Sequence, residues 1–340
     1  MMLARVCRGG LSPTLVSFIK TPVVPKPMLT KIQPSRLFAH DGRTAFTRTA
    51  RRNQTVAEKL ARPATETPFN VGKAVLAGAS VFGLGSLCYY GLGLDSRAGA
   101  IDQMHFWPEY VKERIRTTYM YFGGSVVITA ASAVLCLRSP TVMNLVSRQG
   151  WLAVIGTIVA MIGSGMVAQS IPYKEGLGLK QLAWMVHTGI IGAVVAPICF
   201  MGGPLLMRAA LYTSGVIGGL STVAMCAPSD KFLKMAGPLS IGLGVVFVSS
   251  LGSLFLPPTT ALGASLYSLS IYGGLILFSM FLLYDTQNII KNAQVHPVYH
   301  NKSISPYDPI NNAISIYLDT LNIFLRILTI LSNGGSNRRK

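Results

Sequence analysis

The sequence predicts an all-α protein, a polytopic membrane helix bundle with one leading helix followed by a seven-helix core. Half of the 340 residues are hydrophobic, 12% are charged and the mean hydropathy is +0.46. Soluble domains carry about twice that charged fraction. The charges that are present lie mostly at the ends of eight long apolar runs. A spanning helix needs about 20 predominantly apolar residues, so eight spans are expected.

The net charge of +18 does not indicate a nucleic-acid partner, because much of it comes from the N-terminal segment. Residues 1–57 hold ten Lys and Arg and one acid, Asp41, whereas the remaining chain has 20 basic and 11 acidic residues. We expect no nucleic-acid binding.

The segment over residues 1–38 contains no acid and is interrupted by prolines. A secretory signal needs an unbroken apolar core of about 7–15 residues, whereas an Arg- and Ser-bearing, acid-free segment is typical of a mitochondrial transit peptide. The residues around Phe38 and Ala39 read RLFA, which resembles the pattern at matrix cleavage sites. We expect cleavage between these two residues; a disordered basic tail is the alternative.

The remaining elements follow in order. A polar linker is expected over 39–70, a leading transmembrane helix over 71–94, a loop over 95–116, the seven-helix core over 117–332 and a basic tail over 333–340. Within the core, Pro257 and Pro258 divide an uncharged run of 50 residues into two spans by a tight turn. The apolar runs are 74–94, 117–137, 151–171, 181–207, 209–229, the two halves of 235–284, and 310–331.

Short connections predict that consecutive helices are antiparallel neighbours. The chain has 34 glycines, many clustered inside the spans, and small residues let helices approach closely in lipid. With eight spans both ends lie on one side of the membrane. The Lys and Arg counts of the two sides are nine and ten, so the charge bias does not choose an orientation.

Ionisable residues inside spans are costly and are therefore candidates for function. Asp319 lies ten residues into the last span, and Asp285 lies six residues before Lys291 at the end of the preceding span. The two helices run antiparallel through one loop, so both carboxyl groups are expected at a similar depth. Two acids that meet in a low dielectric cannot both ionise cheaply, so they are expected to share a proton.

Such a pair has two states. Protonated, it is a hydrogen-bonded latch between two helices; deprotonated, it repels and offers hard oxygen ligands to a cation such as Ca²⁺. The sequence thus predicts a proton and cation site at Asp285 and Asp319. Both residues are also candidate Ca²⁺ ligands. The alternative for Asp285 is a polar residue near a helix end.

Four other residues are candidate supporting groups. Arg326 and Asn322 follow Asp319 on the same helical face, so Arg326 is either a counter-ion or an arginine that snorkels to the headgroups. His187 is expected to be a packing histidine, with a proton relay as the alternative. Gln169 is expected at an interface near a span end.

The sequence gives little indication of an enzyme or of a bound cofactor. Five cysteines form no metal-ligand spacing, and there is no phosphate-binding glycine loop. A Gly-Ser-Gly sequence around Ser164, with His187 as a base, is a remote match to an intramembrane serine protease. It lacks the residue that normally separates the nucleophile from the preceding glycine.

Two motifs carry a resemblance to a known family. Residues 281–287 read FLLYDTQ and residues 315–324 read SIYLDTLNIF. They resemble the last two helices of the transmembrane Bax-inhibitor-motif family, over residues 115–332. The resemblance implies a seven-helix fold with a proton-sharing di-aspartate at Asp285 and Asp319. The segments that are similar to its mitochondrial branch are residues 1–94, 119–121 (YMY), 221–229 (STVAMCAPS) and 255–260 (FLPPTT).

The resemblance also implies functions. These are a proton-coupled Ca²⁺ pathway in the mitochondrial inner membrane, cristae organisation, restraint of apoptotic cytochrome c release, and contact with an inner-membrane AAA protease. Exchange and pH-gated leak both stay open. Bacterial relatives pair the di-aspartate with an Arg whose nearest position here is Gln169, and Arg326 is a candidate substitute. The alternative function is a cristae-organising scaffold and protease-regulating interaction protein without transport.

Overall fold

The computed structural model describes residues 62–63, 65–95, 97, 99–146, 150–228, 230–296 and 307–336. Within these residues the regular structure is helical apart from two isolated β-bridges, and eight helices are long and apolar enough to cross a membrane. The predicted all-α polytopic bundle and its eight spans are confirmed. The predicted transit peptide over 1–38, with the cut between Phe38 and Ala39, lies outside the described residues and stays a prediction.

The spans follow the predicted order. The leading helix is α2 (Thr67–Gly91), and short helices and turns join several of the others: α3 (Ala100–Gln103), η3 (Met104–Phe106), α5 (Pro140–Val146) and η5 (Leu233–Met235). The core spans are α4 (Glu109–Leu137), α6 (Trp151–Ser170), α7 (Leu179–Val195) with η4 (Ala196–Met201), α8 (Gly203–Cys226), α9 (Ala236–Phe255), α10 (Ala261–Ser268) continued by the π-helical η6 (Leu269–Gly273) and α11 (Gly274–Val295), and α12 (Pro309–Ser336).

Several boundaries differ from the predicted ones. The expected loop over 95–116 contains α3 and η3, and α4 already begins at Glu109. The leading helix is shifted toward the linker, and α12 enters the expected tail over 333–340. The reason is that a helix can continue past the hydrocarbon into the headgroup region, whereas an uncharged run measures only the apolar part.

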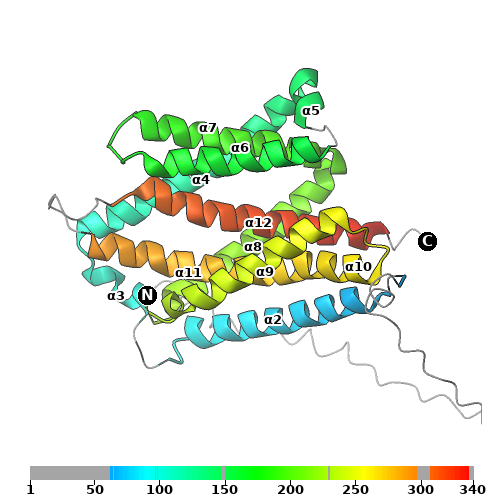
Figure 1. Ribbon diagram of the computed structural model, residues 1–340. Helices are drawn as coiled ribbons and strands as arrows, with labels where there is room; N and C mark the ends of the chain where they lie inside the picture. The colour runs from blue at the N-terminus through cyan, green and yellow to red at the C-terminus, as the bar shows by residue number, and fades with distance from the viewer. Residues whose placement is uncertain are drawn as a thin grey trace, which may run out of the picture. The chain divides into compact units, whose positions relative to one another are not determined.

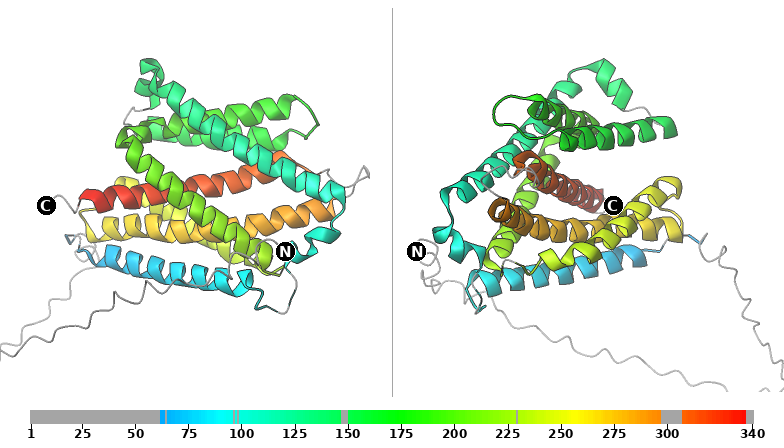
Figure 2. Two further views of the ribbon diagram at one scale, coloured as in Figure 1. Left: turned by 180° about the vertical axis from the view of Figure 1, so that it is seen from behind. Right: turned by 60° about the vertical axis from the view of Figure 1, so that its left-hand side comes forward.

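Helix α12 lies at the centre of the bundle. It packs on α4, α8 and α11, with α6 and α7 on one side and α11, α9 and α2 on the other (Figures 1 and 2). The predicted pairing of consecutive helices holds for α6 with α7, α9 with α10 and α11 with α12. The most extensive contact, however, joins α4 to α7, which are not consecutive spans. The central position of α12 gives its polar residues partners from several spans.

The glycines serve close packing only at particular places. A Cβ at Gly263 would collide with the backbone of Pro257 at the predicted tight turn between α9 and α10, and one at Gly72 would collide with Tyr272 where α2 meets η6. The clustered glycines of α2 and α8 instead have open space where a Cβ would lie, so these two clusters bring no helices together in the structure. The members of the clusters that have open space are Gly78, Gly83, Gly85, Gly215, Gly218, Gly219 and Gly244.

The largest apolar cluster lies along α11 and α12. Leu282 of α11 and Ile316 and Ile323 of α12 are completely buried, and Ala209 of α8 joins them. Many large apolar residues on the other faces of the spans are exposed, which is the distribution expected of a bundle surrounded by lipid. The interior between α11 and α12 is therefore the setting of the candidate site.

Candidate proton and cation site

The two aspartates predicted to meet lie side by side. Asp285 is ten residues before the end of α11 at Val295, and Asp319 is ten residues after the start of α12 at Pro309. At about 1.5 Å per residue, each lies about 15 Å from the end of its helix that leads into the connecting segment. Their side chains make a hydrogen bond to each other, and the two residues are 9% and 6% exposed. We call these residues the acid pair.

Helical spacing explains why the pair forms. Gly274, Phe278 and Asp285 follow one another at intervals of four and seven residues on α11, and Asp319, Asn322 and Arg326 follow at three and four residues on α12. Residues at these spacings share one face of a helix. Because α11 and α12 pack extensively on each other, these two faces meet. Helix α11 continues well past Asp285, so the alternative that this acid sits at a helix end is wrong.

The acid pair has no cationic side chain as a partner among the described residues. The four ion pairs found there join Asp95, Glu109, Glu113 and Asp308 to Lys or Arg. Asp319 Oδ2 is buried and has no hydrogen-bond partner within the described part of the chain. A buried carboxyl pair without a counter-ion must hold a proton or bind a cation, since desolvating two negative charges is too costly.

Neighbouring polar groups surround the pair. Thr286, next to Asp285, hydrogen-bonds to the Tyr119 hydroxyl of α4 and to the carbonyl of Leu282. Thr320, next to Asp319, has a buried hydroxyl that has no partner among the residues the structure describes. An unpaired buried hydroxyl and an unpaired carboxyl oxygen on consecutive residues are the kind of groups that hold water or an ion.

Arg326 follows neither predicted alternative. Its Nη1 donates to the carbonyl and to Oδ1 of Asn322, at 3.1 and 2.8 Å, and its Nε donates to the carbonyl of Ser270 in η6 at 3.1 Å. The guanidinium lies 4.5 Å from the centre of the Phe278 ring. The side chain thus points back along α12 toward Asp319 rather than toward the headgroups, and a carbonyl and an amide take the place of a carboxylate.

His187 and Gln169 lie away from the acid pair. His187, in α7, is 2% exposed, and its Nδ1 lies 2.9 Å from the hydroxyl of Ser164 in α6. Gln169 is exposed at the end of α6, where its carbonyl accepts from Asn311 Nδ2 at 3.3 Å. No hydrogen bond among the described residues joins either of them to the acid pair.

The Ser164–His187 pair joins α6 to α7, and its surroundings differ from those of a Ser-His-acid site. The Ser164 hydroxyl also donates to the carbonyl of Met161 at 3.1 Å. His187 Nε2 is buried and has no partner among the described residues. In Ser-His-acid sites a third group orients the imidazole through its second nitrogen, and in the described part of this chain no group holds that nitrogen.

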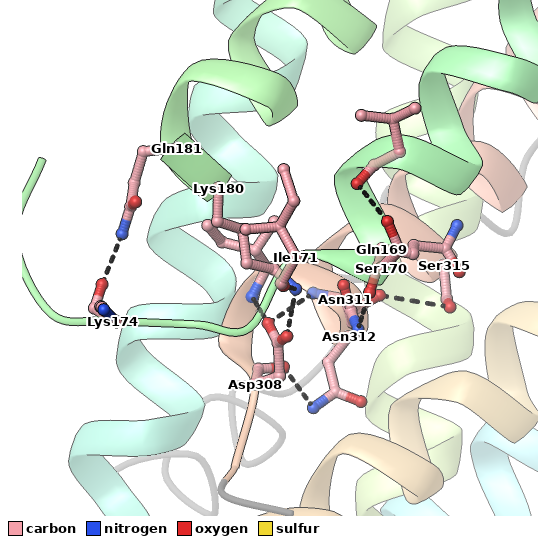
Figure 3. Close-up of polar contacts among 12 residues, drawn as sticks. Gln169, Ser170, Ile171, Lys174, Lys180, Gln181, Asp308, Asn311, Asn312 and Ser315 are labelled. Atoms are coloured by element: carbon pink, nitrogen blue, oxygen red, sulfur yellow. Dashed lines mark hydrogen bonds and ion pairs between the residues drawn. The ribbon is translucent and has the colours of Figure 1, made fainter. Parts of the chain in front are cut away.

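A buried ion pair that the sequence analysis missed closes one end of the bundle (Figure 3). Lys180, 1% exposed at the start of α7, forms an ion pair with Asp308 Oδ2 and donates to the carbonyl of Ile171 at 2.8 Å. Asp308 Oδ1 accepts from the amides of Ile310 and Asn311 at 3.0 Å, so the same carboxylate caps α12. An Asp directly before Pro and an apolar run is a helix start signal, which could have identified Asp308 but not its partner.

A second set of contacts joins the same end of the bundle to α4 and α11. Asn292 of α11 donates to Asn312 of α12 at 3.1 Å. The hydroxyl groups of Tyr307 and Thr118 are 2.6 Å apart, and Arg114 donates to the carbonyls at the end of α11. Burial raises the pKa of the Tyr307 hydroxyl. The acid pair is therefore separated from this end of the bundle by an ordered polar layer.

Comparison with known proteins agrees with the motifs. Residues 111–337 match the family described as Inhibitor of apoptosis-promoting Bax1. The chain is 51% identical over 335 residues to the growth hormone-inducible transmembrane protein of Rattus norvegicus, covering 96% of this chain and 95% of the relative. It is 33% identical over 223 residues to an uncharacterized protein of Helicobacter pylori strain J99, covering 64% and 85%. It is 26% identical over 227 residues to Bax inhibitor 1 of Drosophila melanogaster, covering 66% and 84%.

Proposed function

The chain is a multi-pass membrane protein that belongs to the Bax-inhibitor family, and from this premise we propose that it forms a cation pathway in the mitochondrial inner membrane. The pathway exchanges Ca²⁺ for protons, or leaks Ca²⁺ under the control of pH, through Asp285 and Asp319. The transit-type composition of residues 1–38 supports the mitochondrial location.

One observation carries the proposal: two buried carboxyl groups hydrogen-bond to each other and have no cationic partner within the described residues. A shared proton stabilises them together, and its loss leaves two negative charges that attract a cation. Proton and cation therefore compete for the same oxygens. This competition is the minimum that coupled transport requires.

The chemistry of the pair suits a hard cation. Ca²⁺ binds six to eight oxygen ligands, and the pair supplies four carboxylate oxygens. No group of three or more His, Cys, Asp or Glu is found among the described residues, so carbonyls, hydroxyls and water complete the shell. A site with so few fixed ligands binds weakly and releases its ion, which favours transport over storage.

The proposed cellular consequences follow from altered ion balance. They are maintenance of cristae and restraint of cytochrome c release in apoptosis, with an inner-membrane AAA protease as a partner. The competing proposal is a cristae-organising scaffold without transport, in which the acid pair only holds α11 to α12. The two proposals differ in what removal of the acid pair does.

The decisive measurement is Ca²⁺ and proton flux in liposomes that contain the purified protein. The double substitution Asp285→Asn, Asp319→Asn keeps the shape and hydrogen bonds of the pair and removes its charge. We expect it to abolish proton-dependent Ca²⁺ flux, because neither a proton nor Ca²⁺ is then exchanged at the site. Asp230→Asn, which removes an exposed acid in the segment between α8 and α9, is the matched control and is expected to keep wild-type flux.

Undiminished flux in the double variant would contradict the transport mechanism. Absence of flux in the wild type, together with loss of partner co-purification or of thermal stability in the double variant, would favour the scaffold.

A further inference from the structure

We propose that Arg326 is a positively charged plug, seated on Gly274, that closes the α11–α12 interface on the side of the acid pair facing η6. The acid pair then opens only toward the polar layer at the other end, and a cation can cross only when the guanidinium leaves its seat. This inference rests on the proposed function, because it describes how the same site is closed.

The position of Arg326 places it between the acid pair and one membrane surface. Arg326 follows Asp319 by seven residues, about 10 Å along α12, and ten residues of α12 follow it. Its Nη1 reaches back to Asn322, which is one turn from Asp319. The guanidinium therefore lies directly beyond the acid pair and inside the span.

Three different elements hold the guanidinium in place. Ser270 in the π-helical η6 accepts from Nε, Asn322 of α12 accepts twice from Nη1, and the Phe278 ring of α11 lies under the charge. A π-helical turn interrupts the regular hydrogen-bond ladder of a helix and often marks a functional place. Here it supplies a carbonyl to an arginine that has no carboxylate partner among the ion pairs of the described residues.

The seat requires a glycine at position 274. A Cβ on Gly274 would collide with Nε and Cζ of Arg326, so only glycine lets the guanidinium lie against the α11 backbone. The neighbouring glycine differs, since a Cβ on Gly273 would meet only the end of the Leu269 side chain. The two adjacent glycines thus provide a test position and a matched control.

The rest of this interface is apolar. Leu275 and Phe278 of α11 and Ile323 and Ile327 of α12 belong to the largest apolar cluster. A cation that leaves the acid pair in this direction meets the positive charge of Arg326, which lies among apolar side chains. The two like charges repel each other at short range. Removing or displacing the guanidinium leaves the polar side chain of Asn322 without this charge beside it.

The test measures Ca²⁺ entry into phosphatidylcholine and phosphatidylglycerol liposomes that contain a Ca²⁺-sensitive dye. Arg326→Gln removes the charge, and Gly274→Ala displaces the guanidinium but keeps it. We expect flux at least threefold above wild type in both variants, and wild-type flux in Gly273→Ala. Adding Asp285→Asn and Asp319→Asn to Arg326→Gln is expected to abolish the increase, which a leak through misfolded protein would not do.

The thermal unfolding temperature of each variant is measured in detergent and compared with that of the wild type. Either Arg326→Gln or Gly274→Ala tests the proposal, provided that it is folded. Wild-type or lower flux in a variant that unfolds at the wild-type temperature overturns the plug. An increase that survives loss of the acid pair also overturns it. If the double Asn variant alone keeps wild-type flux, the proposed function itself fails, and that result is separate from the outcome for Arg326.

Discussion

At the scale of single residues, Lys180 shows how a charge can be buried in this bundle. Its ammonium group has two oxygen partners, Asp308 directly before α12 and the carbonyl of Ile171 directly after α6. Because Asp308 also caps α12, the ion pair links the ends of three helices, α6, α7 and α12 (Figure 3). How much stability is lost when one partner is removed depends on whether the other partner is left as a buried, unpaired charge.

Lys180→Met is expected to lower the free energy of unfolding by about 3–5 kcal/mol, because it leaves the Asp308 charge partly buried and unpaired. The double variant Lys180→Met, Asp308→Asn is expected to cost clearly less than the sum of the single variants, since Asn keeps the helix cap and no charge is left behind. Thermal unfolding of the detergent-solubilised protein measures all three. A double variant as unstable as the sum would show that the two residues act independently.

Sequence reasoning reached the acid pair but not the ion pair, for a physical reason. Asp319 lies ten residues inside a span, where only another residue can stabilise it, so its position alone predicts a partner. Lys180 and Asp308 lie at span ends, where charges are ordinarily solvated. Their sequence separation of 128 residues gives no local signal of contact. Arg326 was recognised as a candidate, but its acceptor in a π-helical turn has no sequence signature.

At the scale of elements, the tight turn between α9 and α10 was predictable from its sequence. Pro257 and Pro258 stop one helix, and Thr260 caps the next by accepting from the amide of Gly263 at 3.1 Å. The close approach of Gly263 to the carbonyl of Pro257 makes that glycine part of the turn. The packing of non-consecutive helices was not predictable, because hydropathy locates spans without assigning their neighbours.

Gly263→Ala is expected to lower the free energy of unfolding by about 1–3 kcal/mol, since its Cβ would meet backbone atoms that cannot move aside. Gly244→Ala in the adjacent helix, where the Cβ meets open space, is the matched control and is expected to change stability by less than about 1 kcal/mol. Thermal unfolding compares the two alanine variants directly. Equal effects would show that the turn yields to accommodate the methyl group.

At the scale of the whole molecule, the positive net charge comes from two parts of the chain, the N-terminal segment and the membrane bundle. Residues 1–38 contribute six Lys and Arg and no acid, and the remainder is a membrane bundle with charges at the ends of its spans. We expect the leader to be removed during import, which lowers the net charge of the mature protein.

N-terminal sequencing of the protein isolated from mitochondria is expected to begin at Ala39. Arg36→Gly is expected to abolish or shift this cut, because it removes the basic residue of the cleavage pattern, whereas Arg43→Gly lies beyond the cut and should leave it unchanged. Recovery of the protein with an intact residue 1 from the organelle would contradict the transit peptide.

The central position of α12 has a consequence for biosynthesis. The partners of four earlier groups come from α12 or the residues just before it: Asp308 for Lys180, Asp319 for Asp285, Tyr307 for Thr118 and Tyr317 for Thr129. Until the ribosome has made the eighth span, the Lys180 ammonium group lacks its carboxylate partner and the Asp285 carboxyl group lacks Asp319. The half-made chain must keep them near water or rely on an insertion factor, and only arrival of the eighth span lets the others close.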